Sequence, residues 1–281
     1  MSTYLNCYEM VARIREGLND YSTAKVQGTV TSGSYSNESI IRAINDNGKY
    51  IFDLLFSRMP HQFLTSTSLT ASASVLTLPS DFFKIRRLED ANHLKVHPIS
   101  VDGKHTHDNT GSKYLYYRTG NTLVIDADSV GDTFTLYYYT RPREITMGKA
   151  SAGAATSITL ATSARKEADY YNGMHIEDIT KDLPDTISDY SVARVATIAG
   201  TAAADDYYGL VSELPEEFHP LIYKRALLEL RSWPVSPQPA TTVDLQMFQQ
   251  NLIETIRSYT GDIQHGDKNL EDVLFSLEPM L

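Results

Sequence analysis

The sequence predicts an α+β fold, in which N-terminal helices and a C-terminal helix pair form a helical frame with a β-rich middle and an inserted small β module. Three observations predict it. Apolar residues recur at helical spacing near both ends of the chain, short β-like runs fill the stretch between about 63 and 140, and two stretches of small residues bracket 150–210. We therefore expect three parts, at 1–149, 150–210 and 211–281.

Two helices are expected in the N-terminal part. The first lies within 3–19, where apolar residues recur every three or four positions. A polar stretch from 21 to 35 indicates a loop, and a stronger helix follows from about 37 to 57. Ser36 is a candidate N-cap for this helix. Pro60 prevents its continuation, because proline lacks the backbone N–H that the helix needs.

The middle of the chain predicts strands. A two-residue turn at Gly120-Asn121 joins two of them and favours a hairpin. Both alternating faces of 132–140 are partly apolar, which is typical of a strand covered on both sides. The expected strands before the insert are 63–69, 75–78, 82–88, 114–118, 123–126 and 132–140, and those inside it are 157–161, 174–179 and 193–198.

The C-terminal part returns to helix. A helix is expected from Pro215, with acidic residues in its first turn near the positive end of the helix dipole. A proline-rich breaker at 233–239 ends it. Thr241 and Asp244 then resemble a capping box at the start of an amphipathic helix that runs to Gly261.

Composition limits the classes of function. The formal net charge of −10 gives no electrostatic reason for non-specific nucleic-acid binding. One cysteine, Cys7, excludes a disulfide within the chain, and we expect it to be buried on the first helix. No apolar run approaches the ~18 residues of a membrane span. The N-terminal residues lack the basic and apolar regions of a signal peptide, so none is expected.

Histidines are the first candidates for chemistry. His93, His97, His105 and His107, followed by Asp108, fall within a short stretch. A metal site needs several imidazole or carboxylate ligands that converge at about 2 Å. The surrounding Asp, Gly, Asn and Thr residues favour a solvated polar loop over such a site, so we expect no metal ligand here.

Other catalytic patterns are missing from the sequence. It contains no Gly-x-Ser-x-Gly elbow, no phosphate-binding loop and no Gly-x-Gly-x-x-Gly. Acidic pairs at 126/128, 205/206 and 216/217 have the residue types for acid–base work. Turns and a helix N-terminus explain them more simply. We therefore expect no catalytic residue, no cofactor and no enzyme activity.

Tyrosine is the unusual component, with 18 copies. Clusters occur at 114–117, 137–139, 170–171 and 207–208. Three explanations stay open: packing between strands, a protein–protein interface in which tyrosine is enriched, and a platform for sugar rings.

Several segments, taken in chain order, carry a resemblance to a known family. They are 40–44, 78–88, 120–126, 133–142 and 214–222, and the Leu-Pro-Ser-Asp-Phe of the second is echoed as Leu-Pro-Glu-Glu-Phe in the last. The stretch 156–174 resembles a β module that recurs in virion proteins. Over roughly 35–260, the chain resembles the head-to-tail adaptor, or connector, proteins of tailed bacteriophages. That family has no catalytic motif to transfer.

The resemblance implies a structural virion protein located in the neck and made in the host cytoplasm. It implies a homo-oligomeric ring, usually a dodecamer, that contacts the portal protein and tail proteins. The ring would line the channel for genomic DNA without sequence-specific binding and would touch no membrane. We expect the terminal apolar residues to dock on a partner: Phe275, Leu277, Met280 and Leu281. Two alternatives stay open, a tail-tube or tail-tubular component and a carbohydrate-binding module that acts through the insert.

Overall fold

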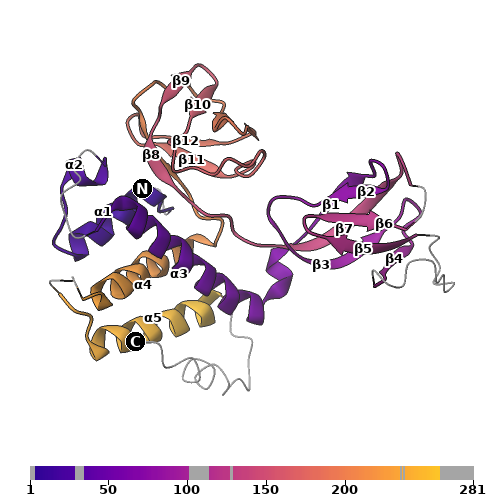
Figure 1. Ribbon diagram of the computed structural model, residues 1–281. Helices are drawn as coiled ribbons and strands as arrows, with labels where there is room; N and C mark the ends of the chain where they lie inside the picture. The colour runs from indigo at the N-terminus through magenta and orange to yellow at the C-terminus, as the bar shows by residue number, and fades with distance from the viewer. Residues whose placement is uncertain are drawn as a thin grey trace. The chain divides into compact units, whose positions relative to one another are not determined.

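The computed structural model describes residues 4–28, 35–100, 114–126, 129–234, 236 and 238–259 (Figure 1). Helices at both ends of this part and a strand-rich middle with several sheets confirm the α+β class. The chain forms two compact units. Unit 1 contains Met1–Leu55 and Pro142–Leu281, and unit 2 contains Phe56–Arg141. The division at 150 and 210 stays a prediction.

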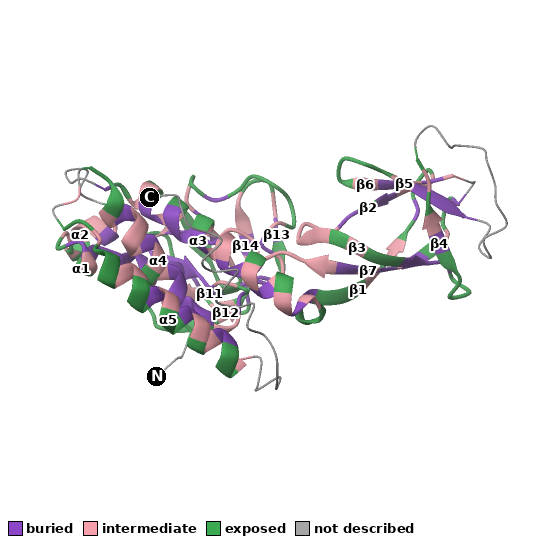
Figure 2. Cartoon of the chain, turned by 90° about the horizontal axis from the view of Figure 1, so that it is seen from below, coloured by how far each residue is buried: buried purple, intermediate pink, exposed green. Residues whose placement is uncertain are grey.

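The helices of unit 1 have amphipathic sequences, so each buries one side and exposes the other (Figure 2). Their ends are capped as the sequence predicts. The hydroxyl of Ser36 accepts the backbone N–H of Ser39 at 3.1 Å, and Thr241 forms a reciprocal capping box with Asp244. The helices are α1 (Cys7–Gly17), α2 (Thr23–Val26), α3 (Asn37–Arg58), which continues into unit 2, α4 (His219–Ser232) and α5 (Thr242–Tyr259).

The start of α4 differs from the expectation. The residues after Pro215 form a 3-10 turn, η3 (Glu216–Phe218), in which the N–H of Phe218 donates to the carbonyl of Pro215 at 2.9 Å. The α-helix begins only at His219. Pro220 lies in its first turn, where the N–H that proline lacks has no partner within a helix.

Close contacts join the helices of unit 1. A Cβ at Gly17 would lie 2.5 Å from a methyl carbon of Leu227, so α1 and α4 approach where glycine leaves room. The guanidinium of Arg225 on α4 lies 3.9 Å from the ring centre of Tyr50 on α3. The hydroxyl of Tyr35, just before α3, donates to the carbonyl of Leu230 at 3.0 Å. These contacts make α4 the central helix of the frame.

Two four-stranded sheets complete unit 1, in the orders β13-β14-β10-β9 and β12-β11-β15-β8, with antiparallel pairing throughout. Three buried tyrosines, Tyr171, Tyr190 and Tyr208, fill their interior. The strands are β8 (Met147–Lys149), β9 (Ala152–Ala154), β10 (Ser157–Thr159), β11 (His175–Asp178), β12 (Leu183–Thr186), β13 (Asp189–Tyr190), β14 (Val195–Thr197) and β15 (Tyr207–Leu210).

Unit 2 is a seven-stranded sheet in the order β1-β7-β3-β4-β5-β6-β2. Its core includes Leu88, Leu123, Phe134, Leu136 and Tyr138. The expected hairpin is confirmed, since Thr119 pairs with Thr122 around Gly120, which has a positive φ of 58°. The strands are β1 (Leu64–Thr70), β2 (Val75–Thr77), β3 (Phe82–Glu89), β4 (Lys95–Pro98), β5 (Leu115–Thr119), β6 (Thr122–Ile125) and β7 (Thr133–Thr140), preceded by a 3-10 turn, η1 (Pro60–Phe63).

Candidate interaction surfaces

The residues considered for catalysis have structural partners. Cys7 is fully buried at the start of α1, as expected, and burial raises the pKa of its thiol, which disfavours the reactive thiolate. The carboxylate of Asp205 pairs with the Lys149 ammonium at 2.8 Å. Asp206 accepts hydrogen bonds from Lys181 and from the backbone N–H of Ala203. The acidic pair at 205/206 thus holds turns of the β sheets in place.

The histidine stretch gives no assembled site in the part of the chain that the structure describes. His93 follows β3, with Nδ1 3.5 Å from the Glu89 carboxylate, and His97 lies on β4. His105, His107 and Asp108 lie outside the described residues. Among those described, no three His, Cys, Asp or Glu residues are grouped to hold a metal ion, and no helix is long and apolar enough to cross a membrane.

The tyrosines divide between packing and surface. In unit 1 the ring of Tyr171 contacts that of Tyr190 edge-on, with 4.8 Å between the ring centres. The hydroxyl of Tyr208 accepts the N–H of Ala161 at 2.9 Å. Because these rings are buried, they offer no platform for a sugar. In unit 2, Tyr137 and Tyr139 are only half-buried and lie on the outer side of β7.

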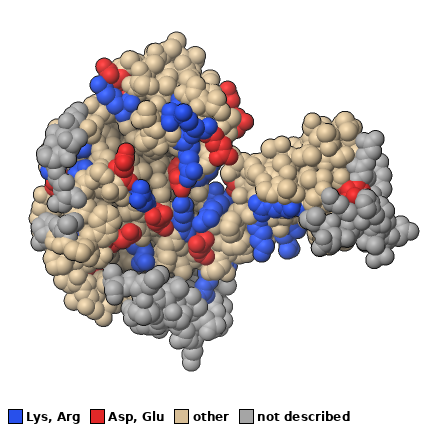
Figure 3. All heavy atoms as spheres, in the orientation of Figure 1, with Lys and Arg blue, Asp and Glu red and all other residues tan. Residues whose placement is uncertain are grey.

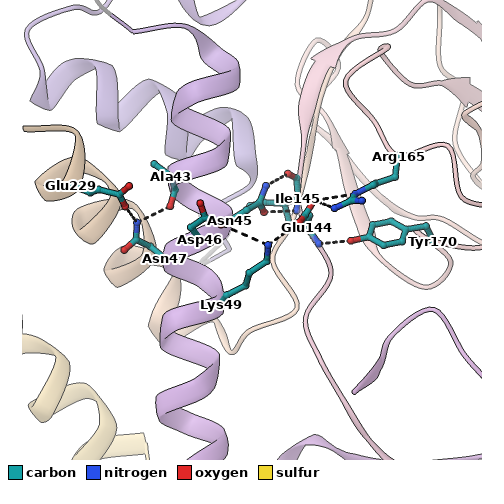
Figure 4. A network of polar contacts seen from close by, with 10 residues as sticks. All are labelled: Ala43, Asn45, Asp46, Asn47, Lys49, Glu144, Ile145, Arg165, Tyr170 and Glu229. Atoms are coloured by element: carbon teal, nitrogen blue, oxygen red, sulfur yellow. Dashed lines mark hydrogen bonds and ion pairs between the residues drawn. The ribbon is translucent and has the colours of Figure 1, made fainter. Parts of the chain in front are cut away.

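A polar network joins α3 to the segment after Pro142, within unit 1 (Figure 4). The amide of Asn45 donates to the carbonyl of Ile145 at 3.0 Å and accepts its N–H at 2.8 Å, as a strand partner would. Glu144 pairs with Lys49 at 2.8 Å and Arg165 at 2.6 Å. Burial alone would raise the pKa of Glu144, but these two cations outweigh it and lower the pKa. The network therefore fixes the sheets of unit 1 to α3.

A polar pocket of about 400 Å³ opens beside this network. Its charged lining mixes signs, with three carboxylates and two guanidinium groups. Ser163 and Thr146 contribute hydroxyls whose oxygens are 3.5 Å apart. No histidine or cysteine lines it, and Glu144 of its lining is held in ion pairs with Lys49 and Arg165. The lining is Glu38, Ile41, Arg42, Asn45, Asp46, Glu144, Ile145, Thr146, Ser163, Arg165 and Tyr171.

The outer side of β1, β7 and β3 in unit 2 forms a second surface. Tyr139 pairs with Leu64 on one side and Lys84 on the other, and Tyr137 pairs with Ser66 and Arg87. Directly paired residues of antiparallel strands point to the same side of a sheet. These six side chains therefore share one face, here called the β1–β7–β3 face, opposite the core.

Sequence reasoning did not identify this face. It expected a strand at 82–88 and treated the tyrosines of 137–139 as a cluster. The available signal was the period of two in β7, which separates Tyr137 and Tyr139 from the buried Tyr138. The four C-terminal residues expected to bind a partner, Phe275, Leu277, Met280 and Leu281, lie outside the described residues.

The described residues thus present half-buried aromatic and charged surfaces, and Cys7, Asp205 and Asp206 among them have structural surroundings. A model of the SU10 adaptor protein family matches residues 5–174, more than half of the chain. The chain belongs to the SU10 adaptor protein family and is a phage adaptor protein, as the sequence resemblance predicts. A comparison with curated protein sequences gave no match.

Proposed function

We propose that the protein forms a homo-oligomeric ring below the portal in the virion neck. Adaptor rings of this kind usually contain twelve copies. The ring would join the DNA-filled capsid to the tail. The observation that carries this proposal is the family match, which covers α1 to α3, the whole of unit 2 and the first strands of the insert. Polar networks such as that around Glu144 support it, because they hold the sheets of unit 1 rigidly against α3.

The proposed role is not enzymatic and needs no cofactor. It is supported by the buried Cys7 thiol, by the structural ion pairs of Asp205 and Asp206, and by the family's adaptor character. The net charge of −10 suits a channel lining, since negative side chains repel the phosphate backbone and allow DNA to pass without sequence-specific binding.

We further propose that the terminal apolar segment attaches the ring to the portal. Phe275, Leu277, Met280 and Leu281 are too few to form a core of their own, so they gain by burial on a partner. Deletion of 270–281 should leave the thermal unfolding of the chain unchanged and reduce its incorporation into particles. Unchanged incorporation would refute the assignment of these residues.

Electron microscopy of the particle neck tests the main proposal. We expect a closed ring of this chain between the portal and the tail, with each copy in a heterologous contact with the next. Absence of the protein from mature particles would contradict the proposal. A ring that crosslinks only to tail proteins would instead indicate the alternative of a tail-tubular component.

A further inference from the structure

The charge of this acidic chain is divided unequally between its two units. Unit 2 carries 9 Lys or Arg and 8 Asp or Glu, a net charge of +1, whereas the rest of the chain carries 16 and 27, a net charge of −11. In Figure 3 one cluster of Lys and Arg side chains lies on unit 2, and further ones lie on unit 1. Lys84 and Arg86 on β3 are exposed and have no ion-pair partner in the described part of the chain. Unit 2 therefore offers cations to an outside partner.

The β1–β7–β3 face has aromatic rings beside Lys84 and Arg87. Tyr137 and Tyr139 are half-buried, while Leu64 is 41% exposed and Lys84 is exposed. The ring of Phe56 contacts Tyr139 edge-on at 5.1 Å and Phe83 edge-on at 5.2 Å, so Tyr139 is held in place before any partner arrives. Pre-ordered tyrosine and exposed arginine are typical of protein interfaces, because little side-chain entropy is lost on binding.

The edge of the sheet points to the same conclusion. β1 is the outermost strand on this side, and its sequence, Leu-Thr-Ser-Thr-Ser-Leu-Thr, has no charge and no proline. Solvent-exposed edge strands normally contain charged residues or proline, because an edge without them can pair with another chain. An uncharged seven-residue edge is best explained by burial in an assembly.

Unit 1 carries a surface of opposite charge, here called the acidic trio: Glu9 on α1, Glu177 on β11 and Asp182 in the turn after β11. Asn6 joins the first two, because its backbone N–H donates to Glu9 and its amide donates to Glu177. Burial and then the neighbouring charges of Glu177 and Asp182 raise the pKa of Glu9. Arg13 on α1 acts against this rise, whereas the described residues provide no ion pair for the exposed Asp182.

Given the proposed ring, we infer that the β1–β7–β3 face of each copy binds the acidic trio on unit 1 of the next copy. In a ring with heterologous contacts, each copy binds the next through two different surfaces. The β1–β7–β3 face and the acidic trio are complementary in charge. Nucleic acid is the weaker candidate. Phosphate binding needs many cations, whereas the described residues of β3 and β4 have three exposed cations without an ion pair, Lys84, Arg86 and Lys95, and Arg87 already pairs with Glu89 at 2.6 Å.

Photo-crosslinking locates the partner of this face. Cys7 is fully buried, so a Ser66→Cys variant has a single accessible thiol to which a benzophenone can be attached. Particles assembled from a mixture of heavy-isotope and ordinary copies distinguish contacts between copies from contacts within one. We expect crosslinks from position 66 to unit 1 of another copy, near residues 9, 177 and 182. Crosslinks only to the portal, to tail proteins or to DNA, or none in an assembled ring, would overturn the inference.

A charge reversal tests the electrostatic part in the full chain. Lys84→Glu should lower the yield of rings about tenfold, and the effect should be partly restored by adding Asp182→Lys. Lys166→Glu is the matched control, because it makes the same change of net charge at an exposed site on unit 1. Equal ring yields for the Lys84 and Lys166 variants would overturn the inference. If the unmodified protein forms no ring in the particle neck, the proposed function itself is refuted.

Discussion

The buried imidazole of His219 should couple the stability of unit 1 to pH. The residue is fully buried at the start of α4. Its Nδ1 accepts the N–H of Leu5 at 3.2 Å, which leaves the proton on Nε2, and Nε2 donates to the carbonyl of Leu214 at 2.9 Å. The neutral ring thus joins the N-terminal segment to the turn before α4. Protonation of Nδ1 would place its N–H opposite the N–H of Leu5, so this hydrogen bond would be lost.

The magnitude follows from these two hydrogen bonds. His219→Ala leaves the N–H of Leu5 and the carbonyl of Leu214 buried without partners, at about 1–3 kcal/mol each. The free energy of unfolding of unit 1 should therefore fall by about 2–6 kcal/mol. At about 2–4 °C per kcal/mol, the Tm should fall by about 4–24 °C. Calorimetry measures the Tm, and hydrogen exchange should show faster exchange at Leu5 than in the unmodified chain.

The pH dependence has a defined sign. Burial lowers the pKa of His219 below its ordinary 6.5, so the unfolded chain binds this proton more strongly than the folded one. Its stabilising contribution is complete above pH 6.5 and is lost as the pH falls from there through the folded-state pKa. The stability difference between the unmodified chain and His219→Gln should thus shrink on acidification, while His61→Gln, at an exposed site, should show no such change. A constant or growing difference would refute the reasoning.

Four further substitutions test the packing, the helix cap and the network by calorimetry. Gly153→Ala should lower the free energy of unfolding by about 1–3 kcal/mol, because its Cβ would lie 2.6 Å from backbone carbons. Gly48→Ala, in open space on α3, should raise it by about 0.5–1 kcal/mol. Equal effects of the two substitutions would contradict the geometry. Thr241→Ala should cost about 1 kcal/mol by removing the capping box of α5, and an unchanged Tm would argue against the cap. Glu144→Gln should cost about 1–2 kcal/mol by weakening its pairs with Lys49 and Arg165. Since the pKa of Glu144 is lowered, that contribution is present above pH 4.5 and lost below it, so the variant and the unmodified chain should converge in acid.

The sequence identified most regular elements of unit 2 and the long helices. Strands at 63–69, 82–88 and 132–140 agree with β1, β3 and β7 to within a residue or two, because alternating apolar residues and the turn residues between them are local signals. The sequence missed β4, β8, β9, β12, β13 and β15, which are too short to show a clear alternation of apolar residues. β15 also depends on a distant partner, since it pairs with β8 almost 60 residues earlier. In the polar stretch read as a loop, Ser22 caps the four-residue α2, which is too short to show a period.

The candidate surfaces were less accessible to sequence reasoning. Neither face of β7 could be assigned to the interior from 132–140 alone, since both contain aromatic residues. Only the sheet shows that Phe134, Leu136 and Tyr138 enter the core and that Tyr137 and Tyr139 remain half-exposed beside Lys84. The acidic trio likewise comes from α1, β11 and the turn after it, which no local pattern connects.

The sequence by itself determined the α+β class, the principal helices and strands, the lack of a catalytic motif and the adaptor resemblance, because each depends on residues within a few positions or on motif order. Only the tertiary structure decided that the described residues after Pro142 pack with the N-terminal helices while Phe56–Arg141 forms its own unit. That outcome depends on contacts such as Asn45 with Ile145, one hundred residues apart. Their formation depends on how whole elements meet, because burial is a property of two surfaces and not of one segment.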